Sequence, residues 1–293
     1  MSSVIDVMLP YYGDVEQMKA AVDSVMMQSS PHWRLVVIDD GYPDEEPARW
    51  FASIADARVV YLRNEQNLGA NGNYRKAVEL VESSWFVMMG ADDIMAPDYL
   101  HVVNRAIQSS EADIIQPGVR VIDENDAVVR PLADRVKRLL SLKPEPGGSV
   151  LGGETLVASL LRANWAYFPS IAWRTSSVRE VGFRPDLDVA QDLGLILDIL
   201  ARGGRMMVLP DVIFEYRRHT ASDSSVRALD GRRFDEERRF FDGEARRFSS
   251  LGWNRASRAA RWHFASRLNA ASLVPKAITR GGAVNRLVRH VFA

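Results

Sequence analysis

A series of short apolar runs, each followed at once by polar residues, constrains the fold of this chain most strongly. Such runs, when turn residues bound them, are typical of buried strands. The runs are Val4–Leu9, Leu35–Ile38, Arg58–Leu62 and Trp85–Met89. Segments with helical spacing of apolar residues separate them, and strands that alternate with helices in this way predict an α/β fold with a mostly parallel central sheet.

The first intervening segment carries a helix start signal. Asp14 is a suitable N-cap, and Gln17 stands three residues later, as in a capping box. Apolar residues then recur at helical spacing, so we expect a helix from Asp14 to Gln28. Further helices are expected over Glu46–Ile54 and Tyr74–Glu82, with a loop over Asn67–Gly72.

The same patterns continue through the rest of the chain. A strand region is expected over Asp113–Ile122 and a strand over Met206–Leu209, with helices over Thr155–Arg162 and Ala190–Ala201. From Asp230 onward, arginine and aromatic residues alternate at helical spacing, which predicts a helical C-terminal region.

Composition excludes several classes of protein. Hydrophobic residues make up 47% of the 293 residues and charged residues 26%, values typical of a folded globular protein. The absence of Cys excludes a disulfide framework, a thiolate metal site and a cysteine nucleophile. The N-terminus lacks the pattern of a secretory signal, and no apolar run approaches the length of a spanning helix, so we expect a cytoplasmic location.

Polar side chains follow each of the first four predicted strands. Parallel α/β sheets bind ligands at the carboxyl ends of their strands, where the loops collect. Four carboxylates at two neighbouring ends would repel one another unless a cation or a hydrogen-bond donor lies between them. The sequence therefore predicts a binding site at this edge, formed by Tyr11, Tyr12, Asp39, Asp40, Asn64, Asn67, Asp92 and Asp93.

Five stretches in order resemble the family 2 glycosyltransferases, over about residues 4 to 225. They are Val7–Tyr12, Val36–Gly41, Gly90–Asp93 with Pro97, Gln191–Leu193, and Tyr216–His219 with Ser222 and Ser224. The resemblance implies an inverting enzyme with a GT-A fold, a Rossmann-like nucleotide-diphospho-sugar domain, over residues 1–229. Its nucleotide half would span about 1–123 and its acceptor half about 124–229, and residues 230–293 would form a basic amphipathic helical region outside the resemblance.

The resemblance also implies the substrates and a nucleotide site. The donor would be a UDP- or dTDP-sugar, and the acceptor a hydroxyl of a saccharide or lipid-linked saccharide. Pro10, Tyr11 and Tyr12 would line the base pocket, with the base stacked on Tyr12. Asp40 can accept a hydrogen bond from the N3–H of uracil or thymine. Asp39 is expected to order the loop, with Asn67 nearby.

Simpler interpretations of these two nucleotide residues stay open. Tyr12 could be a core aromatic residue. Asp40 could merely form an Asp-Asp-Gly turn, since Asp and Gly favour turns.

Asp92 and Asp93 match the family's DxD-type element, with Gly90 where many members carry a further Asp. By resemblance, Asp93 and His219 would hold a divalent cation, and Asp92 the ribose or donor-sugar hydroxyls. Oxygen ligands suit Mg²⁺ or Mn²⁺ rather than zinc. The alternatives are a helix N-cap pair before Met95–Tyr99, and for His219 a structural hydrogen bond.

Asp192 matches the catalytic base of these enzymes, although Gln191 replaces the usual preceding Glu. The alternative is an exposed Asp near a helix start. Arg217 and Arg218 could instead pair with phosphate. The aromatic cluster of Trp165, Tyr167, Phe168 and Trp173 suits either core packing or a platform for the acceptor sugar.

The C-terminal region is strongly basic. From Ala245 to Ala293 there are ten Lys or Arg and no Asp or Glu, which leaves a charge of −11 on the first 244 residues. Two interpretations are open: an interfacial helix on an anionic membrane, or helices packed on the acidic part of the chain. The acidic strand ends argue against nucleic acid as a partner.

Two rival functions also fit parts of the sequence. A sugar nucleotidyltransferase would carry a basic, Gly-rich loop after the first strand, and no Lys or Arg precedes Lys19. A catalytically silent nucleotide-sugar-binding protein is supported only by Gly90 and Gln191.

Overall fold

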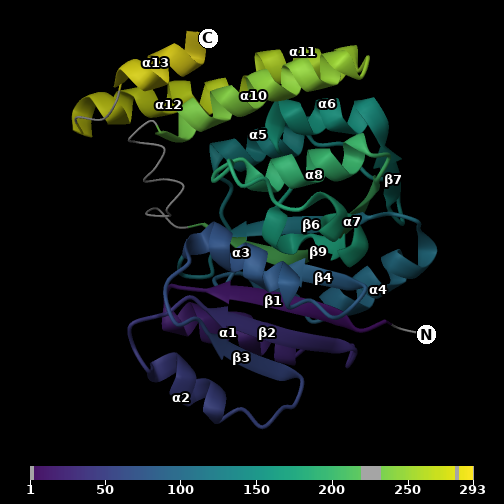
Figure 1. The fold of residues 1–293 in the computed structure, drawn as a ribbon, viewed down its shortest axis with the longest axis vertical. Coiled ribbons are helices and arrows are strands. Elements are labelled where there is room, and N and C mark those ends of the chain that lie inside the picture. The colour runs from purple at the N-terminus through teal and green to yellow at the C-terminus, as the bar shows by residue number, and fades with distance from the viewer. Residues whose placement is uncertain (1–2, 219–231, 281–283, 293) are drawn as a thin grey trace.

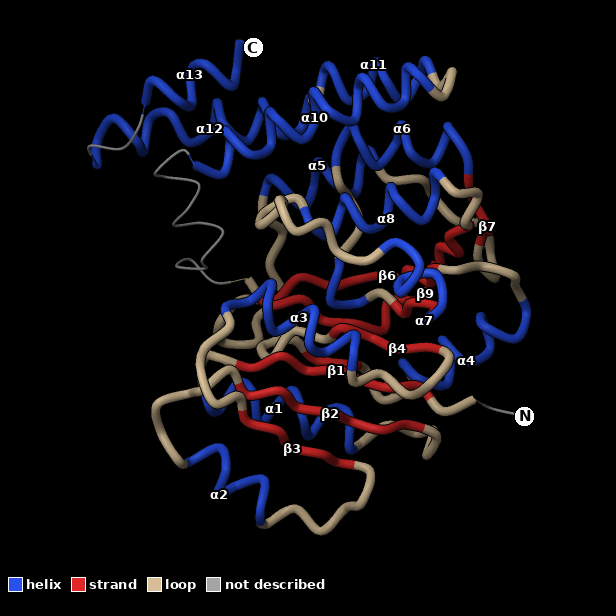
Figure 2. Tube along the Cα trace, viewed as in Figure 1, coloured by secondary structure: helices blue, strands red, loops and turns tan. Residues whose placement is uncertain are grey.

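The computed structural model describes residues 3–218, 232–280 and 284–292. The described strands form one nine-stranded sheet, whose strands are red in Figure 2. Their order is β3-β2-β1-β4-β8-β6-β9-β5, with β7 paired to β9. The strands are β1 Ile5–Tyr11, β2 Trp33–Asp39, β3 Val59–Arg63, β4 Trp85–Met88, β5 Ile94–Met95, β6 Ile114–Ile122, β7 Ser149–Gly152, β8 Ala172–Arg174 and β9 Arg205–Arg217.

Alternating side chains on the parallel strands β1 to β4 build a core on each face of the sheet. Val7 and Leu9 point to one face, and Met8 points to the other. Helices α1 (Val15–Met26) and α4 (Tyr99–Ser109) cover the first face, and α3 (Gly69–Glu79) covers the second. Because successive strand residues alternate between faces, fully buried strands need apolar residues throughout, which is the pattern of the sequence.

The second half of the sheet mixes parallel and antiparallel pairs. β6 and β9 are parallel, whereas the short strand β8 pairs antiparallel with both β4 and β6. The predicted fold class is thus confirmed, but the antiparallel insertions are an addition to it. The other helices before the C-terminal region are α2 Glu46–Ala52, α5 Leu132–Leu140, α6 Gly153–Ala163, the short 3-10 helix η1 Phe168–Ser170, α7 Thr175–Val181 and α8 Gln191–Ala201.

The C-terminal helices form a further layer over α5, α6 and α8 (Figure 1). Phe240, Phe248 and Ala260 belong to the same core as α6 and α8. Ion pairs join Arg184 to Glu244 at 2.7 Å and Arg247 to Asp198 at 2.6 Å. These helices are α10 Arg232–Ser250, α11 Asn254–Trp262, α12 Phe264–Arg280 and α13 Val284–Phe292, and the packing fits the second interpretation of the basic region.

Several predicted elements are confirmed with shifted ends. Asp14 caps α1 by accepting a hydrogen bond from the Gln17 backbone N–H at 3.0 Å. The loop predicted over Asn67–Gly72 is wrong from Gly69 onward, where α3 begins. β9 runs far beyond the predicted Met206–Leu209, because it pairs along its length with β6. Within the described residues, no helix is both long and apolar enough to cross a bilayer.

Candidate active site

Two adjacent tyrosines at the end of β1 have different environments. The side chain of Tyr12 is 58% exposed and meets the Tyr42 ring edge-on, with the ring centroids 5.9 Å apart. Tyr11 is buried, and its hydroxyl donates to the Gly13 carbonyl at 3.1 Å. Tyr12 is therefore not a core residue and offers a ring to a ligand, whereas the ring of Tyr11 packs in the core.

Asp40 follows β2, and its backbone N–H donates to the Tyr11 carbonyl at 2.8 Å. Its Oδ1 accepts hydrogen bonds from Asn64 Nδ2 at 2.7 Å and from the Leu68 backbone N–H at 2.8 Å. Lys76 Nζ in turn donates to Asn64 Oδ1 at 2.6 Å. No described residue donates to Asp40 Oδ2. The carboxylate thus has a fixed orientation and one oxygen available to a ligand donor.

Asp39, Asn67 and Pro10 also belong to the predicted nucleotide site. Asp39 is buried and uses both oxygens, accepting from the Tyr42 backbone N–H at 2.7 Å and from the Tyr61 hydroxyl. Those bonds order the loop after β2. Asn67 is exposed and accepts from the Gly69 backbone N–H at 2.9 Å, while Pro10 is half-buried in β1.

Asp93 is a buried carboxylate with one unpaired oxygen. Its Oδ1 accepts from the Arg217 backbone N–H at 2.8 Å, and its buried Oδ2 has no hydrogen-bond partner among the described residues. Burial, reinforced by the neighbouring charge of Asp92, raises the pKa of Asp93 well above its usual value. A buried oxygen without a donor is costly, so a bound group that supplies positive charge would stabilise it.

Gly90 leaves the space into which both carboxylates point. A Cβ at this position would lie 2.5 Å from Asp93 Oδ2 and 2.9 Å from Asp92 Oδ1. Oxygen donors around a small empty space fit Mg²⁺ or Mn²⁺. Within the described ranges no group of three or more acidic or histidine side chains gathers as a metal site. His219, the second predicted ligand, lies outside the described residues. Asp92 and Asp93 precede β5 rather than a helix, so the N-cap interpretation is wrong.

Asp192 stands in the first turn of α8 and is half-buried rather than exposed. Burial raises its pKa, and the Leu193 backbone N–H, Lys137 and Asn164 offset part of that rise. A carboxylate with a raised pKa holds a proton more readily than an exposed one, which suits a general base.

Tyr74 on α3 connects Asp192 with the residues at the end of β4. Burial and then the charges of Asp92, Asp93 and Asp192 raise the pKa of its phenol to about 12. The charges of all three carboxylates therefore affect the pKa of one side chain, although Asp192 is about a hundred residues from the other two in the sequence. The preceding residue, Asn73, accepts from Asn64, the partner of Asp40, at 3.1 Å. Two successive residues of α3 thus interact with the surroundings of Asp40 and with the charges of Asp92, Asp93 and Asp192.

A second set of charged residues beside Asp192 was not predicted. Asp134 on α5 accepts two hydrogen bonds of 2.7 Å from Arg218 and one of 2.8 Å from the Tyr167 hydroxyl. Lys137 Nζ lies 4.9 Å from the centroid of the Tyr167 ring. Burial and the charge of Arg218 lower the pKa of Lys137 to about 8. The helical spacing of apolar residues after Pro131 could have indicated α5. No local pattern indicated that Tyr167 and Arg218 would contact this helix.

Both arginines after Tyr216 are held by the protein itself. Arg217 is buried, and its side chain donates to the backbone carbonyls of Asp92 at 2.7 Å and Asp123 at 2.9 Å. Arg218 is paired with Asp134. These partners argue against the interpretation of Arg217 and Arg218 as phosphate ligands.

The predicted aromatic cluster divides into two parts. Phe168 and Trp173 lie in the core with ring centroids 5.6 Å apart. Trp165 belongs to the same core but also lines, together with Tyr167, a cavity of about 530 Å³ between α5 and the sheet. Core packing therefore accounts for three of the four residues, and two of the four border an open space.

Comparison with known proteins gives relatives over most of the chain. The chain is 24% identical over 220 residues to the succinoglycan biosynthesis protein ExoO of Rhizobium meliloti, covering 75% of this chain and 62% of that protein. It is 22% identical over 125 residues to the UDP-Glc:alpha-D-GlcNAc-diphosphoundecaprenol beta-1,3-glucosyltransferase WfgD of Escherichia coli, covering 43% of this chain and 49% of that protein.

The fold is also found among solved structures. TarS residues 1–349 of S. aureus, in complex with UDP-GlcNAc, superpose with a TM-score of 0.63 at 16% identity, over 81% of this chain and 65% of that one. The family model described as glycosyl transferase family 2 matches residues 6–157, about half of the chain. The predicted resemblance to this family is thereby confirmed, and the protein belongs to glycosyl transferase family 2.

Proposed function

We propose that the protein is an inverting glycosyltransferase that moves a sugar from a UDP- or dTDP-sugar to an acceptor hydroxyl. The observation that carries the proposal is the buried Oδ2 of Asp93, which has no hydrogen-bond partner among the described residues and faces the space that Gly90 leaves. A donor with its base at Tyr12 and its diphosphate above Gly90 would present its sugar toward Asp192.

Each residue has a chemical role in this proposal. Tyr12 stacks on the base, and Asp40 Oδ2 accepts from the base N3–H. Asp92 holds ribose or sugar hydroxyls. Asp192 takes the proton of the acceptor hydroxyl as its oxygen attacks the anomeric carbon from the face opposite the leaving diphosphate. The displacement is single, so no covalent enzyme intermediate forms.

Asp93, with its unpaired Oδ2, would hold the divalent cation, together with His219. A bound Mn²⁺ or Mg²⁺ supplies Lewis-acid stabilisation of the charge that develops on the leaving diphosphate. The protein itself holds Asp93 in place through the Arg217 backbone N–H, and the side chain of Arg217 fixes the loop that carries Asp92.

The relatives support a role in polysaccharide or glycolipid assembly. One is named for succinoglycan biosynthesis, and another for transfer from UDP-glucose to a diphosphoundecaprenol-linked sugar. A saccharide or lipid-linked saccharide is therefore the acceptor class that we propose.

The proposal is tested first by binding and then by turnover. A thermal-shift panel of UDP- and dTDP-sugars, with and without Mn²⁺, should select one donor, because a ligand that binds the folded state raises its apparent stability. Asp192→Asn should keep the affinity for the donor. It should lower the rates of sugar transfer and of donor hydrolysis by about 10²–10⁴-fold. Unchanged turnover would remove Asp192 from the role of base. Binding without any hydrolysis in the unmodified protein would favour the silent binding protein.

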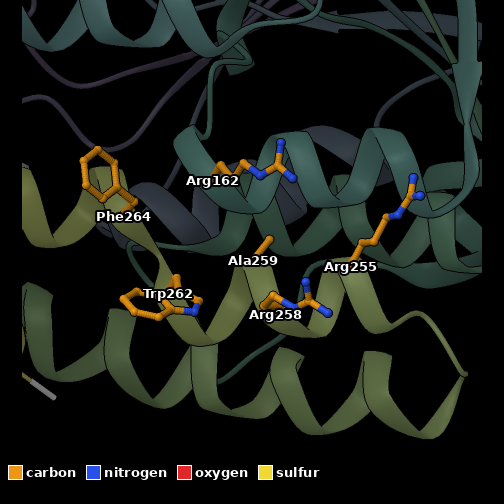
Figure 3. A pocket seen from close by; sticks show the side chains of 6 residues that line it. All are labelled: Arg162, Arg255, Arg258, Ala259, Trp262 and Phe264. Carbon is orange, nitrogen blue, oxygen red and sulfur yellow. The ribbon is translucent and has the colours of Figure 1, made fainter.

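A peripheral membrane contact is a second element of the proposal. Figure 3 shows Arg162 of α6 facing α11, with Arg255 and Arg258 toward one end of a cavity and Trp262 and Phe264 at the other. Its volume is about 300 Å³. The side chains of Trp262 and Phe264 are 65% and 57% exposed. Aromatic rings beside arginines suit the interface of an anionic membrane.

Co-sedimentation with vesicles tests this contact. The protein should bind vesicles containing phosphatidylglycerol more strongly than vesicles of phosphatidylcholine alone. Trp262→Ser with Phe264→Ser should weaken that binding, whereas Met27→Ser, a change at an exposed apolar residue after α1, should not. Equal binding by both variants would count against the contact.

A further inference from the structure

The cavity between α5 and the sheet is large enough for a sugar ring and its substituents. Its volume of about 530 Å³ falls within the range usual for small-molecule sites. The buried side chains of Gln116, Trp165, Val208 and Leu209 line its inner part. Gln116 fixes this wall, since its Nε2 donates to Ser170 Oγ at 2.9 Å and its Oε1 accepts from the Tyr167 backbone N–H at 3.0 Å.

The rim of this cavity is rich in cations for which the described residues provide no acidic partner. Arg130, Arg135, Arg138 and Lys143 are exposed at the rim, and none forms an ion pair with a described residue. Among the described lining residues the only carboxylate is Asp134, which Arg218 already neutralises through two hydrogen bonds. Uncompensated cations around a concave surface concentrate anions there. The opposite is true of the donor end, where carboxylates gather.

The cavity also lies near the proposed base, although Asp192 is not part of its lining. Lys137 and Tyr167 both line it. The charge of Lys137 acts on Asp192, and Tyr167 packs on Tyr216 with ring centroids 5.3 Å apart. Tyr216 is followed by Arg217, whose backbone N–H donates to Asp93 Oδ1 at 2.8 Å. A ligand in the cavity would thus be only a few residues away from the carboxylates of the donor end.

We infer that this cavity is an acceptor subsite that recognises an anionic group, a phosphate or a carboxylate, carried by the acceptor saccharide. Arg135 and Arg138 on α5 provide the charge, and the inner wall takes the sugar ring. The assignment of this cavity to the acceptor rests on the proposed function. The selectivity of the cavity for anionic sugars can be measured without turnover.

Calorimetric titration tests the subsite with three probes of similar size: glucose, glucose 1-phosphate and glucuronate. Each is titrated with and without saturating UDP, which occupies the donor end. We expect both anionic sugars to bind more tightly than glucose, and the stronger of the two identifies phosphate or carboxylate as the preferred group. Arg135→Gln with Arg138→Gln should weaken anionic binding by about tenfold and leave UDP affinity unchanged. Circular dichroism checks that this variant is folded.

The matched control is Arg49→Gln with Arg105→Gln, which removes two exposed charges outside the cavity lining. It should bind the anionic sugars as the unmodified protein does. Equal binding of glucose and its anionic analogues, or an equal loss in both double variants, would overturn the inference. Failure of UDP to bind would count against the proposed function alone.

Discussion

The carboxylate of Glu236 on α10 accepts a hydrogen bond of 2.7 Å from the backbone N–H of Val189, in the loop that leads into α8. The same oxygen accepts from the N–H groups of Asp188 at 3.0 Å and Ala190 at 3.1 Å. Asp192 follows two residues later. A helix outside the family motifs therefore fixes the approach to the proposed catalytic base.

Replacing Glu236 should impair turnover more than binding. Glu236→Ala releases three backbone donors, and displacement of a catalytic group by about 1 Å can cost about 10²-fold in rate. We expect kcat to fall by roughly 10- to 100-fold with little change in UDP affinity. Glu236→Gln keeps an acceptor oxygen and should be milder. The control is Asp242→Asn, which also removes one negative charge from α10 but at an exposed position. An equal effect of this control on kcat would contradict the positioning role of Glu236.

Asp93 should govern the metal dependence of donor binding. Asp93→Asn keeps an acceptor oxygen for the Arg217 N–H but removes the charge, so Mn²⁺ should no longer strengthen UDP binding in a calorimetric titration. Asp98→Asn on the exposed N-cap of α4 serves as the control. Identical Mn²⁺ dependence in Asp93→Asn and the unmodified protein would place the cation elsewhere.

Gly90→Ala gives an independent test of the same space. The added Cβ would meet Asp93 Oδ2 at 2.5 Å and displace it. We expect weaker donor binding in the presence of Mn²⁺ with a smaller change in its absence. Gly13→Ala, where a Cβ would meet nothing within 4 Å, should leave both affinities close to normal.

Lys137 should set the acidic limit of activity. Its positive charge lowers the pKa of Asp192, so Lys137→Met should raise that pKa. Asp192 must be deprotonated to act as base, and the acidic limb of the profile of kcat/KM against pH should therefore move to higher pH. The control is Lys19→Met, because Lys19 is paired with Glu16 and Glu46 rather than acting on Asp192. This variant should leave the acidic limb unchanged. A limb that moves to lower pH, or not at all, would contradict this account.

Asp6 should contribute strongly to stability. It is buried in β1, and Arg34 and the Ser83 hydroxyl donate to it at 2.7 Å. Asp6→Ala leaves these donors unpaired and should lower the free energy of unfolding by about 3–5 kcal/mol in a urea titration. Glu180→Ala, at an exposed ion pair with Arg202, should cost about 1 kcal/mol or less.

The contribution of Asp6 should also depend on pH. Burial raises its pKa, but the hydrogen bonds from Arg34, Glu82 and Ser83 outweigh this, and the net pKa lies below its usual value. The stabilisation is therefore complete above the pKa of an unfolded Asp and is lost as the pH falls through the folded-state pKa. Asp6→Ala should show a shallower loss of stability in that acidic range.

The parts of the site that the sequence predicted are local ones. Asp40 and Asp93 come within four residues of the ends of apolar runs, and a strand end is defined by its own residues. The same locality explains the confirmed starts of α1 and α8. Neither prediction required knowledge of which strands are neighbours, because all parallel strands of one sheet end at the same edge.

The parts that were missed depend on distant contacts. Arg218 meets Asp134 across 84 residues, and Glu236 meets Val189 across 47. No spacing rule links such residues, since the contact exists only after α5 and α10 have packed. The strand β8 was missed for a related reason: its three residues gain their pairing from β4 and β6 and carry too short a pattern of their own.

The shared core of α6, α8 and the C-terminal helices sets a practical limit on shortening this protein. A fragment truncated to the region of the sequence motifs would expose the apolar surface that Phe240 and Phe248 cover in the full chain. Such a surface promotes aggregation in solution. The smallest well-behaved unit for crystallisation or assay should therefore retain α10 and α11, well past the last recognisable motif.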